Sequence, residues 1–299
     1  MSRNQLIGIL LAVGLAVFLT GLIVVAGSPA VLNPKGILAS QQRDLLVIAT
    51  LLMLIVVIPV FVMTFVFAWR YRAGNRRAAY TPDWDHHRLA EIIWWAVPGI
   101  IIAGLAILTW QSSHRLDPFR PLDAAAKPLT VQVIALQWKW LFVYPEQDIA
   151  SVNLARFPVD TPINFEITAD APMNSFWIPQ LGGQIYAMAG MHTQLHLEAS
   201  ETGAYRGVSA NLSGRGFSGM DFTAEATTTA DFYQWVRSAK QSTNRLDANS
   251  YRELSRPTQD HPRLTYVLAD DRLYEKIIMR YLAPQTDGSH NRPGHRGGR

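Results

Sequence analysis

The chain has 299 residues, of which 49% are hydrophobic and 17% are charged, and its formal net charge is +4. This composition is too apolar and too weakly charged for a fully water-soluble protein, so lipid must solvate part of the chain. The positive charge comes largely from one arginine-rich loop and an arginine-rich C-terminus, so it indicates no nucleic-acid partner. Cysteine is absent, which excludes disulfides and thiolate chemistry.

The first apolar segment covers residues 6–26, follows the basic residue Arg3 and ends in small residues. This order of features is typical of a signal peptide, and we expect residues 1–26 to form one. A segment of this length could also stay in place as a third membrane span. The topology of the rest of the chain is the same in both cases.

Two further apolar segments, residues 45–69 and 92–110, carry no charged side chain. Each has the length of about 20 residues that a helix needs to cross roughly 30 Å of hydrocarbon. The connection at 70–91 is rich in arginine, which marks it as a cytoplasmic loop. We therefore predict a transmembrane hairpin, with a lead-in at 27–44 and everything after residue 110 on the periplasmic side.

After the hairpin the pattern changes to short runs of β-type residues separated by Pro, Gly and Asn. The predicted strands, which we expect to pair in an antiparallel sandwich or barrel, are 129–134, 140–144, 163–167, 193–197 and 205–209. Helical periodicity returns after Thr227, with a short helix predicted at 249–255. Residues 284–299 are rich in Gly, Pro and Arg and are expected to be disordered, with His290 and His295 solvated.

The segment 203–220 resembles the copper loop of subunit II of cytochrome c oxidases, in which a cupredoxin domain holds two coppers. The family pattern is Cys-x-Glu-x-Cys-x-x-x-His-x-x-Met, with an upstream His in an Asp-x-x-x-His-Ser-Phe segment. On this chain the ligand positions fall on Asn174, Ser209, Asn211, Ser213, Phe217 and Met220. Only the methionine is matched. A copper pair needs bridging thiolates, so we expect no metal at this site.

The same degenerate loop is a feature of subunit II of bo-type ubiquinol oxidases, which this chain resembles along nearly its whole length. The resemblance extends to the segment after Thr227. The segments that carry it are 53–59, 67–73, 138–140, 144–147, 173–179, 184–191 and 214–220. It implies an α+β membrane protein with an N-terminal two-helix transmembrane hairpin, a periplasmic cupredoxin-like β-sandwich without copper at 111–227 and a C-terminal helical arm at 228–283.

The resemblance also implies a place in a larger assembly in the bacterial inner membrane. Subunit I of that assembly would carry the haems, one copper and the ubiquinol site, and subunits III and IV would accompany it. Dioxygen is reduced to water there with proton pumping, while this chain would hold no cofactor of its own. Because electrons come from quinol within the membrane, a copper relay for a water-soluble donor is unnecessary.

Glu91 lies at the cytoplasmic start of the second span, four residues before Trp95. The family has a glutamate in the same Glu-x-x-x-Trp setting, where it marks the mouth of a proton channel. An ionisable group at a membrane boundary suits that role. The structural alternative is an acidic residue placed near a helix N-terminus, where the helix dipole favours it.

Several other residues have simpler interpretations. Trp138-Lys139-Trp140 resembles the aromatic patch that passes electrons to copper in relatives, but we expect core packing here. The histidine pairs His192/His196 and His86/His87 lack a third ligand, so neither is expected to bind metal. Gly27 stands where many family members have a lipid-bearing cysteine, so lipidation at that position is not possible.

Two other functions stay open from the sequence. The chain could be a membrane-tethered cupredoxin that handles copper outside an oxidase, although the missing thiolates argue against this. It could also be a purely structural or sensory module on the outer face. Co-purification with a large haem-containing subunit would separate these possibilities from the oxidase interpretation.

Overall fold

The computed structural model describes residues 14, 19–22, 26–27, 29–75, 86–122 and 126–282. These residues form two compact units: Met1–Asp123 with the loops Pro179–Gly183 and Leu197–Glu201, and the remainder from Ala124 onward. The expected signal peptide lies mostly outside the described residues. The predicted disordered tail and much of the arginine-rich loop lie outside them as well.

The first unit contains a short 3-10 helix, η1 (Ala30–Leu32), and two long helices, α2 (Ile37–Arg70) and α3 (Arg88–Arg115). Both long helices are apolar enough to cross a membrane, and no side chain in their apolar windows is buried. Pro59 lies inside α2 and Pro98 inside α3. The two-helix hairpin is thus confirmed, with helices that run beyond the uncharged segments at both ends.

The chain just before α2 is held by backbone hydrogen bonds to the two loops of the same unit. The amide of Lys35 donates to the carbonyl of Gln180 at 2.7 Å, and the amide of Ser200 donates to the carbonyl of Lys35 at 2.8 Å. A Cβ on Gly36 would lie 2.4 Å from the carbonyl oxygen of Glu198. Position 36 therefore requires glycine, because any side chain would push the two backbones apart.

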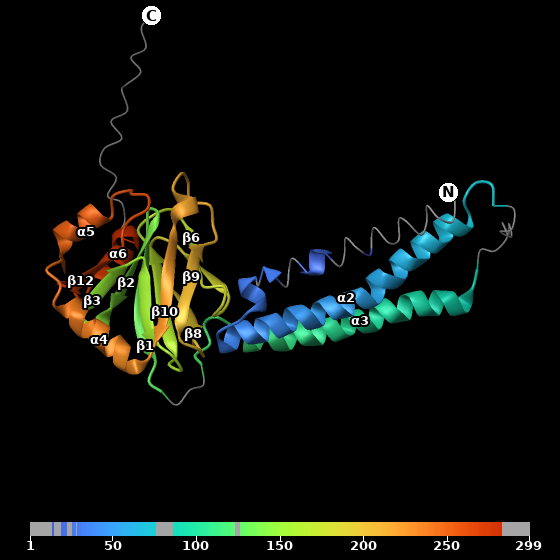
Figure 1. Ribbon diagram of the computed structural model, residues 1–299, viewed down its shortest axis with the longest axis horizontal. Helices are drawn as coiled ribbons and strands as arrows, with labels where there is room; N and C mark the ends of the chain where they lie inside the picture. Colours follow the sequence, from blue (N-terminus) through green and yellow to red (C-terminus); the bar gives the residue numbers. More distant parts are fainter. Residues whose placement is uncertain are drawn as a thin grey trace, which may run out of the picture. The chain divides into compact units, whose positions relative to one another are not determined.

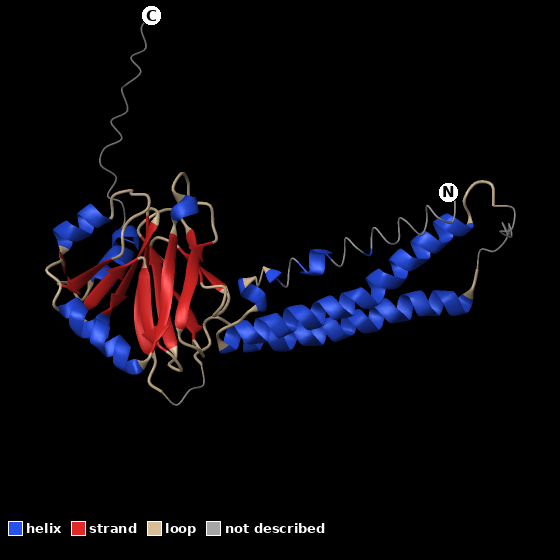
Figure 2. Cartoon of the chain, in the orientation of Figure 1, coloured by secondary structure: helices blue, strands red, loops and turns tan. Residues whose placement is uncertain are grey.

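The second unit is a β-sandwich of two sheets (Figures 1 and 2). A seven-stranded sheet has the order β11-β12-β3-β2-β1-β5-β8, and a five-stranded sheet has the order β4-β10-β9-β6-β7. The strands are β1 (Leu129–Leu136), β2 (Lys139–Tyr144), β3 (Ile149–Val152), β4 (Leu154–Pro158), β5 (Ile163–Ala169), β6 (Asn174–Trp177), β7 (Gln184–Ala187), β8 (Thr193–Leu197), β9 (Gly203–Ser209), β10 (Asp221–Thr227), β11 (Arg245–Leu246) and β12 (Leu264–Leu268). Two 3-10 turns, η2 (Pro145–Gln147) and η3 (Phe217–Gly219), connect them.

The five predicted strands are all present, but the expectation of a purely antiparallel sandwich is wrong. β1 pairs with β5 in parallel, with Leu129 opposite Ile163, and β4 pairs with β10 in parallel. The reason is that β2, β3 and β4 intervene between β1 and β5, and β5 to β9 intervene between β4 and β10, so each connection crosses over instead of turning back as a hairpin.

The core between the two sheets is built from aromatic side chains. Trp140 and Phe142 of one sheet meet Phe176 and Phe222 of the other, with ring centroids 5.1–6.2 Å apart. All four are at most 3% exposed. Gly207 leaves room for the Phe222 ring, since a Cβ there would lie 2.1 Å from it. Aromatic contacts of this kind stabilise a sandwich beyond the area that they bury.

The C-terminal segment contains α4 (Thr229–Lys240), α5 (Ala248–Leu254) and α6 (Leu273–Leu282), and it is not a purely helical arm. Its strands β11 and β12 extend the seven-stranded sheet, with β12 antiparallel to β3. A second apolar cluster joins α5 and α6 to the outer face of that sheet: Ile134, Leu136, Leu141, Val143, Ala150, Val152, Leu246, Tyr251, Leu254, Leu273, Tyr274 and Ile277. The arm is therefore part of the domain that it covers.

Asp170, directly after β5, fastens this segment to the sandwich. Its carboxylate, 6% exposed, accepts hydrogen bonds from the hydroxyls of Tyr251 at 2.6 Å and Tyr281 at 2.7 Å and from the Arg280 guanidinium at 3.0 Å. Burial and the bond to Asp170 raise the pKa of Tyr281 to about 12. One carboxylate thus joins two helices to the end of a sheet strand.

Replacing Asp170 with asparagine should loosen the arm. Asp170→Asn removes the charge that three donors share inside a nearly buried site, and should lower the free energy of unfolding by about 2 kcal/mol. Urea denaturation of the full-length chain in detergent measures this loss. Lys240→Gln, which breaks an exposed ion pair with Asp148 at 3.4 Å, should cost under about 0.5 kcal/mol. Equal effects of the two substitutions would contradict the role assigned to Asp170.

Candidate functional site

The site centres on the loop between β9 and β10, where the sequence places the ligand positions of a copper pair. Pairing of β6 with β9 sets Phe176 opposite Ser209 and so brings the first residue of β6, Asn174, to the end of β9. The Ser209 hydroxyl donates to Oδ1 of Asn174 at 2.9 Å, and both side chains are buried. A neutral hydrogen bond therefore joins the positions expected for a cysteine and a histidine.

The amide nitrogen of Asn174 also has a hydrogen-bond partner. Its Nδ2 donates to the carbonyl of Pro172 at 2.7 Å. Asn211 lies close by, and its Nδ2 donates to the carbonyl of Met173 at 3.0 Å. These bonds satisfy polar groups that burial would otherwise leave without partners.

The remaining positions lie farther along the loop. The Ser213 hydroxyl is 4.0 Å from the sulfur of Met220, which is 2% exposed. Phe217 begins η3, and its backbone bonds to Gly214 and Met220 shape the turn. The structure thus brings Asn174, Ser209 and Asn211 together and places Ser213 beside Met220, and the amide of Ser209 donates to the carbonyl of Met220 at 3.3 Å.

The donor set does not fit a binuclear copper centre. Its side chains offer hydroxyls, amides and one thioether, whereas a copper pair requires soft bridging thiolates and imidazoles. Among the described residues there is no group of three or more His, Asp or Glu side chains placed to hold a metal ion. The site can therefore order the loop but offers no evident electron relay.

Trp138 covers this loop. It has a left-handed backbone (φ 68°), and its indole Nε1 donates to the carbonyl of Ser213 at 3.1 Å. A Cβ on Gly216 would lie 2.5 Å from the ring, so only glycine lets the indole rest there. Core packing is confirmed for Trp140, which is fully buried, but Trp138 is half-buried and packs on the loop instead.

Lys139, between the two tryptophans, is 1% exposed. Its ammonium group donates to the carbonyl of Arg256 at 2.7 Å and to the hydroxyl of Thr258. Burial lowers the pKa of Lys139 to about 8. Burial of this lysine was not predictable from the sequence, because a charged residue in a strand normally faces water.

Among the described residues, neither histidine pair lies in a group of three or more His, Asp or Glu side chains. Nδ1 of His192 lies 3.1 Å from the hydroxyl of Tyr274, while His196 is buried and its pKa is lowered by burial. His87 caps α3, and its Nδ1 accepts a hydrogen bond from the amide of Ala90 at 3.1 Å. His290 and His295 lie outside the described residues.

Glu91 lies in the first turn of α3, where its amide donates to the carbonyl of His87 at 3.0 Å. It is half-buried and lines a shallow hollow with Arg88, Ile92, Trp95 and Ala96. Trp95, one turn farther on, is 78% exposed. The carboxyl group is thus placed at the end of a membrane span beside an aromatic surface, as the sequence predicted.

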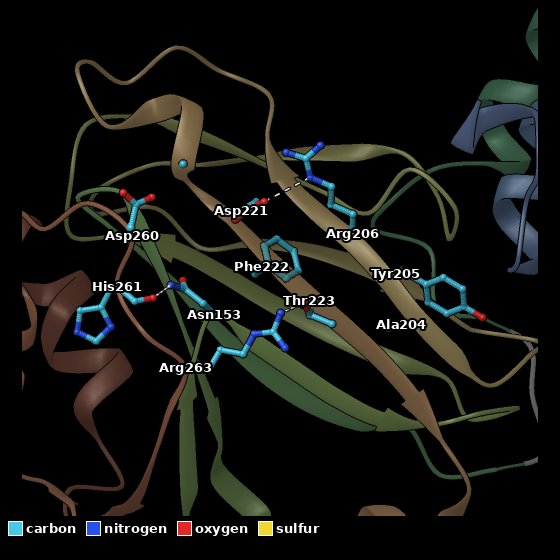
Figure 3. Close-up of a pocket in the computed structure, with 11 residues that line it drawn as sticks. Asn153, Ala204, Tyr205, Arg206, Asp221, Phe222, Thr223, Asp260, His261 and Arg263 are labelled. Atoms are coloured by element: carbon cyan, nitrogen blue, oxygen red, sulfur yellow. Dashed lines mark hydrogen bonds and ion pairs between the residues drawn. The ribbon is translucent and has the colours of Figure 1, made fainter. Parts of the chain in front are cut away.

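A polar cleft of about 410 Å³ lies beside the loop, on the outer face of the five-stranded sheet (Figure 3). Arg206 pairs with Asp221 at 3.4 Å, and Arg263 donates to the hydroxyl of Thr223 at 2.6 Å. Nδ2 of Asn153 donates to the carbonyl of His261 at 2.9 Å. These hydrogen bonds connect the segment before β12 to the sheet across the cleft.

Two protein-family models match the chain. Residues 149–227 match the periplasmic domain of cytochrome c oxidase subunit II, and residues 240–285 match the aromatic-rich motif of these oxidases. The chain is 49% identical to a cytochrome bo(3) ubiquinol oxidase subunit 2 from Pseudomonas putida over 94% of this chain and 88% of the relative. The corresponding protein of Pseudomonas aeruginosa is 53% identical over 83% and 75%.

A ubiquinol oxidase subunit 2 from Acetobacter aceti is 49% identical over 84% of this chain and 82% of the relative. Among solved structures, the periplasmic domain of cytochrome oxidase subunit II from Bradyrhizobium japonicum is similar with a TM-score of 0.38 and 24% identity. That match covers 41% of this chain and 98% of the other.

The buried lysine predicts a pH dependence of stability. Because the pKa of Lys139 is lower in the folded chain than in the unfolded chain, the unfolded state binds more protons between pH 8 and about 10.5. Stability from this group should therefore rise as the pH rises through that range. Lys139→Met removes this titrating group. The unfolding free energy of the wild type, relative to that of Lys139→Met, should therefore increase between pH 8 and 10. A difference that is constant over this range would contradict the lowered pKa.

Rebuilding the ligand set should recreate a copper pair. The full-length chain carrying Asn174→His, Ser209→Cys, Asn211→Glu, Ser213→Cys and Phe217→His beside Met220 should bind two coppers, because the fold already places these positions at one loop. Metal analysis and electron-spin resonance of the chain produced alone measure this, with the wild type as control. Tight binding of two coppers by the wild type, or none by a folded variant, would contradict the assignment of the loop.

Proposed function

The chain belongs to the subunit II family of the bo-type ubiquinol oxidases, and on that basis we propose that it acts as the non-redox subunit II of a proton-pumping oxidase. It is a subunit of an oxidoreductase complex of the bacterial membrane, with two membrane spans and a periplasmic domain. Haems, copper and the ubiquinol site would reside in subunit I, accompanied by subunits III and IV. The reaction of the complex would be reduction of dioxygen to water.

The observation that carries the non-redox role is the buried hydrogen bond between Ser209 and Asn174. It occupies positions where copper-bearing relatives have ligands, and it joins neutral groups that cannot hold or delocalise cuprous copper. This arrangement supports a copper-free subunit. Electrons would then pass from quinol in the membrane to subunit I without entering this chain.

A role in assembly follows from the surface of the hairpin. Large apolar side chains are exposed along α2 and α3, among them Phe61 at 58%, Trp94 at 59% and Ile100 at 72%. Pro59 and Pro98 each remove a backbone donor inside a span, which a neighbouring helix can compensate better than lipid can. We propose that these two helices pack against subunit I and support its assembly.

Proton entry is the second proposed role, and it rests on Glu91. A half-buried carboxyl group at the inner end of α3, next to the open hollow by Trp95, is suited to collect protons from the cytoplasm. Its place in the first turn also fits a helix-dipole role. The two roles differ in what happens to turnover when the charge is removed.

A copper-handling function outside an oxidase is the alternative that the donor set argues against. A cupredoxin that delivers copper would need a soft ligand group, and Met220 is the one such ligand at this loop. The family membership favours the oxidase role, and so do the hydrogen-bonded side chains of the loop between β9 and β10.

Removing the Glu91 carboxylate should slow the oxidase without disturbing its assembly. Glu91→Gln should lower ubiquinol oxidation about 10-fold or more, as expected for loss of a proton-transfer group, while Glu91→Asp should be milder. Turnover and haem content of the purified complex measure activity and assembly separately. Unchanged turnover in a fully assembled Glu91→Gln complex would leave only the helix-dipole role.

Two control variants complete this experiment. Glu146→Gln removes an exposed carboxylate of the outer domain that pairs with Lys127 at 2.9 Å, and should leave turnover unchanged. Met220→Leu conserves side-chain volume and removes the last copper-type ligand, so it should also leave turnover and copper content unchanged. Loss of copper from the complex in Met220→Leu would contradict the non-redox role.

A further inference from the structure

A pocket of about 300 Å³ lies in the second unit, between the helices α5 and α6 of the C-terminal segment. We name it the arm pocket. Its size is at the lower end of the range found for small-molecule sites. It shares no lining residue with the Glu91 hollow or with the cleft on the five-stranded sheet. Neither the copper-type loop nor the proton-entry proposal gives it a role.

Three cationic side chains line the arm pocket. Arg252 comes from α5, and Lys276 and Arg280 come from α6. Lys276 and Arg280 are four residues apart and so lie on the same face of their helix, where like charges repel. The fold therefore gathers positive charge at this pocket, at a cost that an anion would offset.

Two carboxylates of the chain offset part of this charge. Nζ of Lys276 donates to Asp270 at 2.6 Å, and Nη1 of Arg280 donates to Asp170 at 3.0 Å. Arg252 meets no carboxylate among the described residues, and its Nη1 donates to the amide oxygen of Asn249 at 3.3 Å. The neighbouring acid Glu253 pairs with Arg256 instead, at 3.0 Å. One positive charge of the arm pocket, that of Arg252, is thus left without a counter-charge.

The two guanidinium groups also have donors to spare. Arg280 reaches Asp170 through Nη1, and Arg252 reaches Asn249 through Nη1. Their Nε and Nη2 groups form no hydrogen bond within the described part of the chain. A ligand that accepts from both must present oxygens toward two helices. A tetrahedral oxyanion does this, whereas the two oxygens of a carboxylate lie in one plane and match a single guanidinium fork.

The floor of the arm pocket is apolar. Leu273 and Ile277 of α6 line it and are 7% and 0% exposed, and Tyr251 of α5 is 3% exposed. Charges that approach such a floor are screened less than charges in open water, so a bound anion would interact more strongly here than on a flat surface. The cationic side chains supply the charge and the apolar floor supplies the setting.

We propose that the arm pocket binds an oxyanion of the phosphate class, free or as part of a larger molecule. Its oxygens accept hydrogen bonds from Arg252 on one side and from Arg280 and Lys276 on the other. The anion supplies the counter-charge that Arg252 lacks. It also bridges α5 and α6, so the ligand adds a second polar link between two helices that Asp170 already joins.

Titration calorimetry of the full-length chain in a neutral detergent tests this proposal. Inorganic phosphate is added in a phosphate-free buffer at constant ionic strength. The wild type should bind one phosphate per chain and should bind acetate more weakly. Arg252→Gln should bind phosphate about 10-fold more weakly, since a charge-assisted bond is lost. Arg252 is exposed, so this variant should fold as the wild type does.

Arg256→Gln is the matched control, because it changes the net charge equally just beyond the same helix but lies outside the pocket. It should bind phosphate as the wild type does. A short-chain phosphatidic acid separates the two sources: tighter binding than inorganic phosphate indicates a lipid phosphate, and equal binding indicates a free one. Absence of saturable phosphate binding by the wild type, equal affinity in Arg252→Gln, or acetate binding as tight as phosphate binding would overturn the proposal.

Discussion

The buried hydrogen bond between Ser209 and Asn174 is the interaction on which the functional interpretation depends. It exists because β6 and β9 are neighbours in the five-stranded sheet, and the aromatic core beneath them fixes that pairing. With thiolates absent, the loop keeps its shape through neutral donors and acceptors and through the indole of Trp138 above it. The positions that match copper ligands in the family pattern are thus held by hydrogen bonds within the chain.

Much of the fold was predictable because its signals are local. The two spans follow from uncharged length, and five strands follow from short β-type runs such as the alternating Thr193–Leu197. Two of the missed strands lack such a signal: β4 ends in proline, and β7 is short and lies at a sheet edge. The parallel pairing of β1 with β5 depends on residues that are far apart in sequence, which no local pattern encodes.

The candidate site was also predictable only where its signal is local in the sequence. The ligand positions were found from spacing, since spacing along a loop survives when the ligands change. The burial of Lys139 was missed because it depends on Arg256 and Thr258, more than a hundred residues later in the chain.

The position of β12 has a consequence for how the chain is exported. β12 is the antiparallel partner of β3, although residues 149–152 leave the membrane more than a hundred residues before residues 264–268. Until residues 264–268 have crossed, β3 is paired with β2 on one side and presents unpaired backbone groups on the other, which favour association with other chains. A ribosome that stops before residue 264 would therefore release a sandwich with an open side.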